Sequence, residues 1–194
     1  MRVEVKEQQC PYDGFFQLER AVLRFEKFNG QMSRPVERLL FERGDSVAVL
    51  LYDRVQDRVI LVEQFRYPAY VREQPEGRLL EIVAGTVEPG RTPAEVAKSE
   101  LMEEAGYALE ELIYVTMFYA SPGACSERIY LYLGHISSAE RVGRGGGVGA
   151  GEDIRVHEIR LDEALEMVRQ GRIRDAKTII ALQELALRLG RKAR

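Results

Sequence analysis

The sequence predicts an α+β fold in which a main domain follows a small N-terminal antiparallel β extension. Strand-like segments fill most of the first 45 residues and recur later, whereas helical patterns are confined to one central segment and the C-terminal end. The polar run Glu42-Arg43-Gly44-Asp45 separates the β-rich start from the rest. We therefore expect an N-terminal β domain at residues 1–45 and a main domain at residues 46–194, which suits a chain of 194 residues.

The N-terminal extension is expected to contain a hairpin. Residues 15–28 are strand-like, Asn29-Gly30 is a strong turn signal, and residues 36–41 can return as a second strand.

The main domain is expected to contain further strands and to end in two helices at residues 161–170 and 176–189. The strand that ends at residue 84 leads directly into a glycine loop that begins at Gly85. The expected strands are residues 46–52, 59–65, 79–84, 112–119, 129–133 and 155–159.

The central helix carries clear start and stop signals. Thr92 is an N-cap, Pro93 fits the first helical position, and Glu95 completes a capping box three residues after the cap. Gly106 then supplies a residue that tolerates the left-handed conformation just beyond a helix.

Three carboxylates share one face of this helix, at Glu100, Glu103 and Glu104. Residues three and four apart in a helix are neighbours, and like charges at that spacing weaken the helix. A divalent cation would explain the arrangement, because Mg²⁺ is held by carboxylates and substrate phosphates. Judged by spacing alone, a solvated acidic face is the simpler interpretation.

A glycine-rich segment covers residues 143–153 and ends in Glu152 and Asp153. Dense glycine indicates mobility, which suits either an ordinary surface connection or a lid that closes on substrate. As part of a lid, Glu152 or Asp153 could deliver a carboxylate to a metal cluster.

A third segment, Ala120-Ser-Pro-Gly-Ala-Cys-Ser-Glu-Arg128, lies between two expected strands. Turn chemistry alone explains its Ser-Pro-Gly sequence. Ser126 and Glu127 are candidates to contact a ribose or phosphate, and Cys125 reads as a structural thiol.

Composition limits the possible functions. The net charge is −3, so no basic surface indicates nucleic-acid binding. Cys10 and Cys125 alone give neither a disulfide framework nor a zinc site, and they suggest a reducing compartment. The N-terminus has no signal-peptide pattern and no segment is apolar enough to span a membrane, so a cytoplasmic location is expected.

Residues 85–107 resemble the Nudix box, a pattern of Gly, five residues, Glu, seven residues, Arg-Glu, an apolar residue, any residue, Glu-Glu, any residue, Gly and an apolar residue. Arg91 stands where the family usually has Glu, and Ser99 where it usually has Arg. In the family these two positions support the loop and helix rather than hold metal. The residues in register are Gly85, Glu100, Leu101, Glu103, Glu104, Gly106 and Tyr107.

Further segments are similar to the ADP-ribose pyrophosphatase branch of that family, and the resemblance extends from about Gly14 to Leu189. The run Gly145-Gly-Gly-Val148 followed by Glu152-Asp-Ile154 is more similar to GDP-mannose pyrophosphatases. The segments of the first branch are Phe41–Gly44, Glu63–Tyr70, Glu81–Gly85, Ala120–Gly123 and Ile173–Thr178.

The resemblance implies a Nudix fold, with a mixed β-sheet sandwiched between helices, and a site that binds Mg²⁺, for which Mn²⁺ can substitute. Glu103, Glu104 and Glu152 would be catalytic, and Arg38 and Arg66 would contact the nucleotide diphosphate, although either could be an ordinary surface arginine. It also implies a homodimer with exchanged N-terminal β domains, so that Arg38 enters the partner's site. The implied metal ligands are the backbone carbonyl of Ala84 and the carboxylates of Glu100, Glu103, Glu104 and Glu152.

The implied reaction is Mg²⁺-dependent hydrolysis of a nucleoside diphosphate sugar, foremost ADP-ribose to AMP and ribose 5-phosphate. GDP-mannose or a UDP-sugar is an alternative substrate. A catalytically weak nucleotide-sugar sensor is the other alternative, favoured by Arg91, Ser99 and by Ala150, which stands where related enzymes have a glutamate proposed as the base. The complete carboxylate set argues against the sensor.

Overall fold

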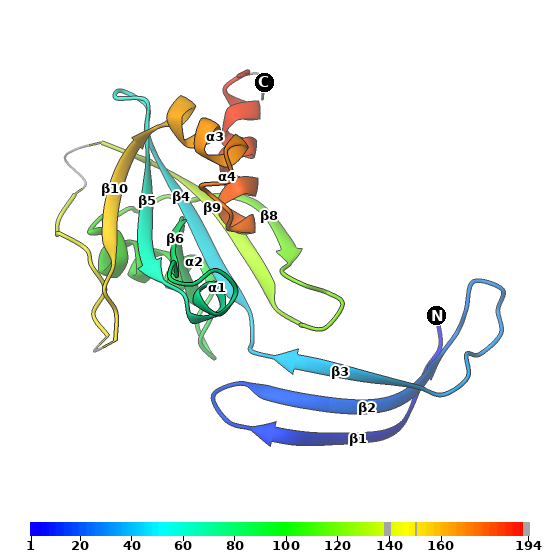
Figure 1. Cartoon of the computed structure of the whole chain (residues 1–194). Coiled ribbons are helices and arrows are strands. Elements are labelled where there is room, and N and C mark those ends of the chain that lie inside the picture. Colours follow the sequence, from blue (N-terminus) through cyan, green and yellow to red (C-terminus); the bar gives the residue numbers. More distant parts are fainter. Residues whose placement is uncertain (138–140, 150, 192–194) are drawn as a thin grey trace. The chain divides into compact units, whose positions relative to one another are not determined.

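The computed structural model describes residues 1–137, 141–149 and 151–191, and it divides the chain into two compact units (Figure 1). The N-terminal unit comprises Met1–Asp45 and Phe118–Arg128. The main unit comprises Ser46–Met117 and the residues from Ile129 onward.

The N-terminal unit is built on an antiparallel sheet in the order β1-β2-β3 (Val3–Asp13, Gln17–Phe25 and Val36–Glu42). β1 was not predicted, because most of its residues are polar and give no sustained alternation of apolar and polar side chains. The strand predicted at residues 15–28 is observed as β2 and is shorter at both ends. Gly30 lies in the expected turn with φ of 79°. No residue of the three strands is buried within the single chain.

The tip of a later hairpin completes this unit. The Phe41 N–H donates to the Ala124 carbonyl oxygen at 2.7 Å, and the Ser126 N–H donates to the Phe41 carbonyl oxygen at 3.3 Å. Arg128 also binds Asp45 through two nitrogens, at 2.9 and 2.6 Å. Residues 118–128 therefore join the β-rich unit although they lie far along the chain.

The main unit is organised around a mixed sheet in the order β10-β5-β4-β9-β8, as the resemblance implied. Its central strand β4 is buried along its whole length and pairs in parallel with β9, with Ser46 opposite Ile129. The strands are β4 (Ser46–Asp53), β5 (Arg58–Phe65), β8 (Ile113–Tyr119), β9 (Arg128–Ile136) and β10 (Arg155–Arg160).

Two short strands fill a gap inside this sheet. β4 and β5 pair only near their connecting turn and then separate, so β6 (Arg78–Glu81) pairs with β5 and β7 (Val83–Thr86) pairs with β4. The single strand predicted at 79–84 is therefore two strands. This arrangement places Ala84 opposite Ala48, and the chain leaves the sheet after Thr86.

Helices cover both faces of the sheet (Figure 1). Val47, Val49 and Leu51 of β4 share one core with α2 and η1, and the alternate side chains of the strand point to the face that α3 and α4 cover. None of the helices in the described ranges is long and apolar enough to cross a membrane. The helices are α1 (Tyr67–Arg72), which was not predicted, α2 (Pro93–Glu100), η1 (Leu101–Ala105), α3 (Leu161–Arg169) and α4 (Ala176–Arg188).

Candidate active site

The helix that carries the carboxylates begins as predicted. The Thr92 hydroxyl accepts from the Glu95 N–H at 3.3 Å, and the Glu95 carboxylate accepts from the Thr92 N–H at 2.7 Å. Pro93 occupies the first turn, and Gly106 ends the segment with φ of 76°. The capping box and the glycine stop are thus confirmed.

The end of this helix differs from the continuous α-helix that the sequence predicts. Residues Leu101–Ala105 form one π-helical turn, η1, at whose end the Gly106 N–H is directed to the carbonyl oxygens of Leu101 and Met102. Glu100 is therefore the last residue of α2, whereas Glu103 and Glu104 lie on the wider turn. Such single π turns recur at functional sites.

Glu100 and Glu104 are harder to ionise than ordinary glutamates. Burial raises the pKa of Glu104 to about 7, against the opposing effect of the Ala84 N–H, which lies 3.3 Å from its Oε2. Burial also raises the pKa of Glu100 to about 7, reinforced by the charges of Glu103 and Glu152. Carboxyl groups with raised pKa values that converge on one place are typical of functional sites.

The chain at Gly85 passes directly against Glu100. A β-carbon added to Gly85 would lie 2.0 Å from the Glu100 Oε1 atom, so only glycine allows this approach. Together with the Ala84 hydrogen bond to Glu104, this contact seats the end of β7 against two of the carboxylates. The backbone at residues 84–85 therefore lies beside both Glu100 and Glu104.

The glycine-rich segment is packed onto the carboxylate helix. The Gly146 N–H donates to the Glu104 carbonyl oxygen at 2.9 Å, and the Gly147 N–H donates to that of Glu103 at 3.1 Å. A β-carbon on Gly145 would lie 2.3 Å from the Glu104 carbonyl oxygen. The glycines thus permit close packing against η1 as well as conformational freedom.

Glu152 lies at the end of this segment and binds its own loop. Its Oε2 atom accepts from the N–H groups of Val148 and Gly149, at 2.8 and 2.9 Å. Its charge acts on Glu100, whereas the exposed Asp153 lies 3.6 Å from Arg78. Ala150, where the sequence lacks the usual base, lies outside the described residues.

Replacing Gly145 with alanine is expected to displace the loop and to lower the melting temperature by several degrees, because the clash is with backbone and φ is 67°. Gly151→Ala is the matched control, because an added β-carbon there meets no atom within 4 Å. Thermal melts of both variants check the prediction. Equal melting temperatures would show that the loop does not depend on this packing.

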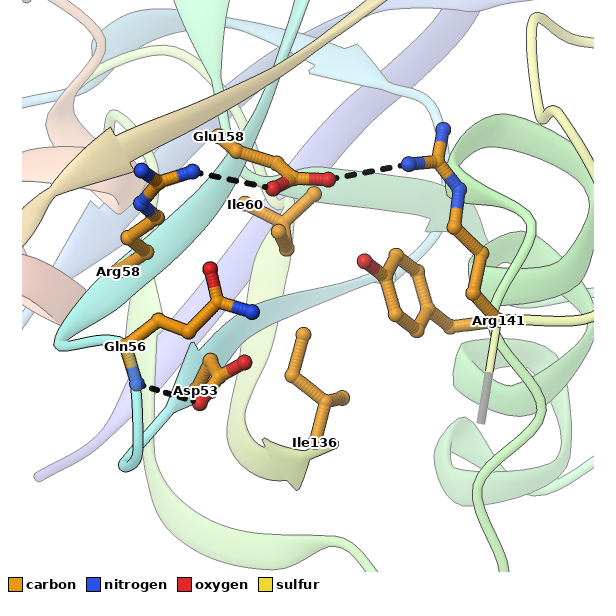
Figure 2. Close-up of a pocket in the computed structure, with 8 residues that line it drawn as sticks. Asp53, Gln56, Arg58, Ile60, Ile136, Arg141 and Glu158 are labelled. Carbon is orange, nitrogen blue, oxygen red and sulfur yellow. Dashed lines mark hydrogen bonds and ion pairs between the residues drawn. The ribbon is translucent and has the colours of Figure 1, made fainter. Parts of the chain in front are cut away.

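The start of the same segment is fixed to the sheet by Arg141. Its guanidinium lies 3.0 Å from Glu158, which also pairs with Arg58 at 3.5 Å, and 5.9 Å from the centre of the Tyr107 ring. Figure 2 shows Glu158 between the two arginines at the rim of a cavity of about 130 Å³. Because Glu158 pairs with both arginines, the cavity has no strongly cationic wall, and we assign it to anchoring the loop.

Arg66 lies near the carboxylates but is held by an acidic partner. Its Nε and Nη2 atoms donate to Glu81 at 2.7 and 2.9 Å, and Lys177 binds the same carboxylate at 2.6 Å. Burial alone would raise the pKa of Glu81, which is 2% exposed, but the two cations keep it below its usual value. The sequence analysis missed the roles of Glu81 and Lys177, although both lie in segments on which the resemblance rests.

The remaining predicted site residues belong to the N-terminal unit. Arg38 is exposed on β3, where its Nη1 donates to the Glu37 carbonyl oxygen at 2.8 Å. The Ser126 hydroxyl donates to the Glu42 carboxylate, and Glu127 lies 3.4 Å from Arg43. These contacts neither require nor exclude a ligand.

The main-unit residues fit a hard divalent cation in their chemistry. Carboxylates and a backbone carbonyl are the oxygen ligands that Mg²⁺ takes, and the contact at Gly85 brings a carbonyl-bearing strand to Glu100. Within the described ranges, no three acidic, histidine or cysteine side chains are gathered closely enough to hold an ion. Burial, with a smaller effect from the charge of Glu100, raises the pKa of Glu104, and a bound cation would favour its ionised form.

Comparison with known proteins agrees with this geometry. The chain is 40% identical over 185 residues to an ADP-ribose pyrophosphatase of Escherichia coli (strain K12). The matched region covers 95% of this chain and 88% of that protein. It is 37% identical over 188 residues to a GDP-mannose pyrophosphatase of Cronobacter sakazakii, covering 97% of both. A solved structure described as an ADP compounds hydrolase shares the fold, with a TM-score of 0.72 at 20% identity over 99% of this chain and 98% of that chain.

The carboxylate helix and the sheet around it also match a described family. The NUDIX domain matches residues 42–182, which include β4, the glycine loop, the three carboxylates and about half of α4. From this match and from relatives similar over nearly their whole length, we conclude that the chain belongs to the Nudix family.

Proposed function

We propose that this Nudix hydrolase cleaves the diphosphate bond of a nucleoside diphosphate sugar with the help of Mg²⁺, and that ADP-ribose, cleaved to AMP and ribose 5-phosphate, is its main substrate. The observation that carries the proposal is the pair of carboxyl groups, Glu100 and Glu104, whose pKa values are raised beside the backbone of Gly85. Relatives named as ADP-ribose pyrophosphatases support the choice of substrate.

In this proposal Glu100, Glu103, Glu104, Glu152 and the Ala84 carbonyl hold the metal. Mg²⁺ held by these groups would neutralise the diphosphate oxygens and make the attacking water more acidic. A carboxylate, either Glu152 or one of the helix glutamates, takes the proton as the water attacks phosphorus in line. A stable diphosphate needs this help, because its negative oxygens repel the nucleophile.

Arg66 is proposed to orient the diphosphate. Glu81 fixes two of its nitrogens, and its Nη1 atom has no hydrogen-bond partner among the described residues. A guanidinium held in this way can bind a phosphate oxygen without a further loss of side-chain freedom. Glu81 and Lys177 then act on the substrate only through Arg66.

GDP-mannose is the second candidate substrate, because other relatives of similar identity carry that name. A panel of ADP-ribose, GDP-mannose and a UDP-sugar with Mg²⁺ or Mn²⁺, read out as AMP, GMP and UMP released, tests both. Fastest release of AMP supports the proposal, and fastest release of GMP replaces the substrate while retaining the chemistry. Nucleotide-sugar binding without turnover would instead identify a sensor.

Glu152→Gln is expected to lower turnover more than nucleotide affinity. The amide keeps an oxygen that can accept from Val148 and Gly149 but loses the charge that a metal or a proton requires. Steady-state kcat together with the Kd of a non-hydrolysable analogue checks this expectation. Equal losses in both quantities would assign Glu152 to binding or folding.

The exposed N-terminal sheet supports the proposed dimer. Its three strands bury no residue within the single chain, although apolar side chains such as Val3, Val5 and Leu39 lie along it. A second copy of the chain that exchanges this sheet would cover the surface and bring Arg38 to the partner's site. A sedimentation mass that equals one 22.1 kDa chain at micromolar concentration would exclude the dimer.

A further inference from the structure

The two departures from the usual family pattern contact each other. The Arg91 Nη2 atom donates to the Ser99 hydroxyl at 2.5 Å and to the Glu95 carbonyl oxygen at 3.0 Å. The Ser99 hydroxyl in turn donates to the same Glu95 carbonyl at 3.3 Å, so it is satisfied as both donor and acceptor. A loop arginine is thereby fixed to the helix one residue before Glu100.

The other end of Arg91 is fixed within the loop. Its Nη1 atom lies 3.3 Å from the Glu88 carboxylate, and its N–H donates to the Glu88 carbonyl oxygen at 3.2 Å. This loop runs from Gly85, which touches Glu100, to Thr92, which caps α2. One guanidinium therefore joins Glu88, in the middle of this loop, to Glu95 and Ser99 on the carboxylate helix.

We propose that Arg91 is a positioning residue, whose bridge to Ser99 holds the Gly85 loop against Glu100 and thereby sets the affinity for the divalent cation. The inference rests on the proposed function for the identity of that cation. In the usual pattern, glutamate on the loop and arginine on the helix carry opposite charges at these positions. Here the positively charged side chain, Arg91, is on the loop, and the hydrogen-bond acceptor, Ser99, is on the helix. The loop and the helix are therefore still linked at these two positions, but the donor and the acceptor have exchanged places.

The surrounding charges make this reversal testable. Glutamate at position 91 alone would add a carboxylate beside Glu88 and near Glu100, on which the charge of Arg91 now acts. Arginine at position 99 alone would place a second guanidinium against Arg91. Only the double variant Arg91→Glu/Ser99→Arg restores an attractive pair, so the two changes should compensate each other when combined.

The experiment is titration calorimetry of Mn²⁺ into the metal-free protein without substrate. Arg91→Met is expected to weaken Mn²⁺ binding about tenfold, because loss of a residue that supports metal ligands typically lowers metal affinity 10- to 100-fold. Ser99→Ala is expected to weaken Mn²⁺ binding by a smaller factor. Arg91→Glu should bind most weakly, at about 10²-fold, and the double variant should recover to within about threefold of the unaltered protein. The control is Arg188→Met, which removes an arginine of similar exposure that pairs with Glu184 on α4.

Kinetics then separate positioning from catalysis. The half-saturating Mg²⁺ concentration should rise in Arg91→Met, while kcat at saturating Mg²⁺ stays within about threefold. The proposal is overturned if Arg91→Met and Ser99→Ala bind Mn²⁺ as tightly as Arg188→Met, or if the double variant binds as weakly as Arg91→Glu. Absence of nucleotide-sugar cleavage alongside the expected Mn²⁺ pattern would overturn only the proposed function.

Discussion

Glu104→Gln is expected to lower kcat for Mg²⁺-dependent cleavage of ADP-ribose by roughly 10²-fold or more, as the loss of strong transition-state stabilisation typically does. The substitution keeps the shape of the side chain and an oxygen that can accept from the Ala84 N–H, and it removes only the charge. Glu103→Gln is expected to have an effect of the same order. Steady-state kinetics at saturating Mg²⁺ check both.

The same variant should be more stable than the unaltered protein when no metal is present. The pKa of Glu104 is about 7 in the folded chain and 4.5 in the reference state, so ionisation favours the unfolded chain. Removing this carboxylate should therefore raise the melting temperature at about pH 8 by several degrees. If Glu104 served only the fold, its substitution would lower both the melting temperature and the activity.

The control for Glu104→Gln is Glu163→Gln, which changes an exposed glutamate on α3 and should alter neither quantity. Undiminished kcat in Glu104→Gln would remove this residue from the mechanism. A lower melting temperature of the metal-free variant would instead show that the buried charge is compensated by contacts within the fold.

Removal of divalent metal is expected to abolish hydrolysis and to make the protein less stable as the pH rises. Because the pKa values of Glu100 and Glu104 are raised to about 7, the unfolded chain ionises first, and stability is lost between about pH 4.5 and just above pH 7. Mg²⁺ binds only the ionised carboxylates. It should therefore raise the melting temperature more at about pH 8 than at about pH 5.5.

Scanning calorimetry with Mg²⁺ or with a chelator at the two pH values tests this expectation. Glu81 acts in the opposite direction, because its pKa is lowered and its contribution to stability is lost only as the pH falls below about 4.5. Between pH 5.5 and pH 8, the pH dependence of stability therefore reports on Glu100 and Glu104, whose pKa values are raised. A Mg²⁺ effect of equal size at both pH values would show that Glu100 and Glu104 do not bind the ion.

Local signals in the sequence were sufficient to predict much of the carboxylate helix. Thr92, Glu95 and Gly106 act through contacts a few residues apart, and all three behave as predicted. The π turn could not be predicted, because it depends on how Leu101 and Ala105 pack into the core under β4. Sequence spacing alone places Glu100, Glu103 and Glu104 on a regular α-helix.

Long-range partners explain most of the other differences. Arg66 was predicted as a substrate residue without its partner, since Glu81 reaches it only when β6 pairs with β5, and Lys177 of α4 reaches only Glu81. β1 escaped prediction because its residues are polar and exposed, so no buried face produces an alternating pattern. The division of β6 from β7 likewise depends on the separation of β4 from β5.

The parallel pairing of β4 with β9 also has a consequence for how the chain folds. Ser46 meets Ile129 only after every intervening element has been synthesised, and closing so long a loop is entropically costly. β5, β7 and α2 contact β4 over much shorter separations. We therefore expect the carboxylate helix to assemble early while one edge of β4 remains open, so that slow docking of β9 limits the folding rate and leaves that edge vulnerable to aggregation.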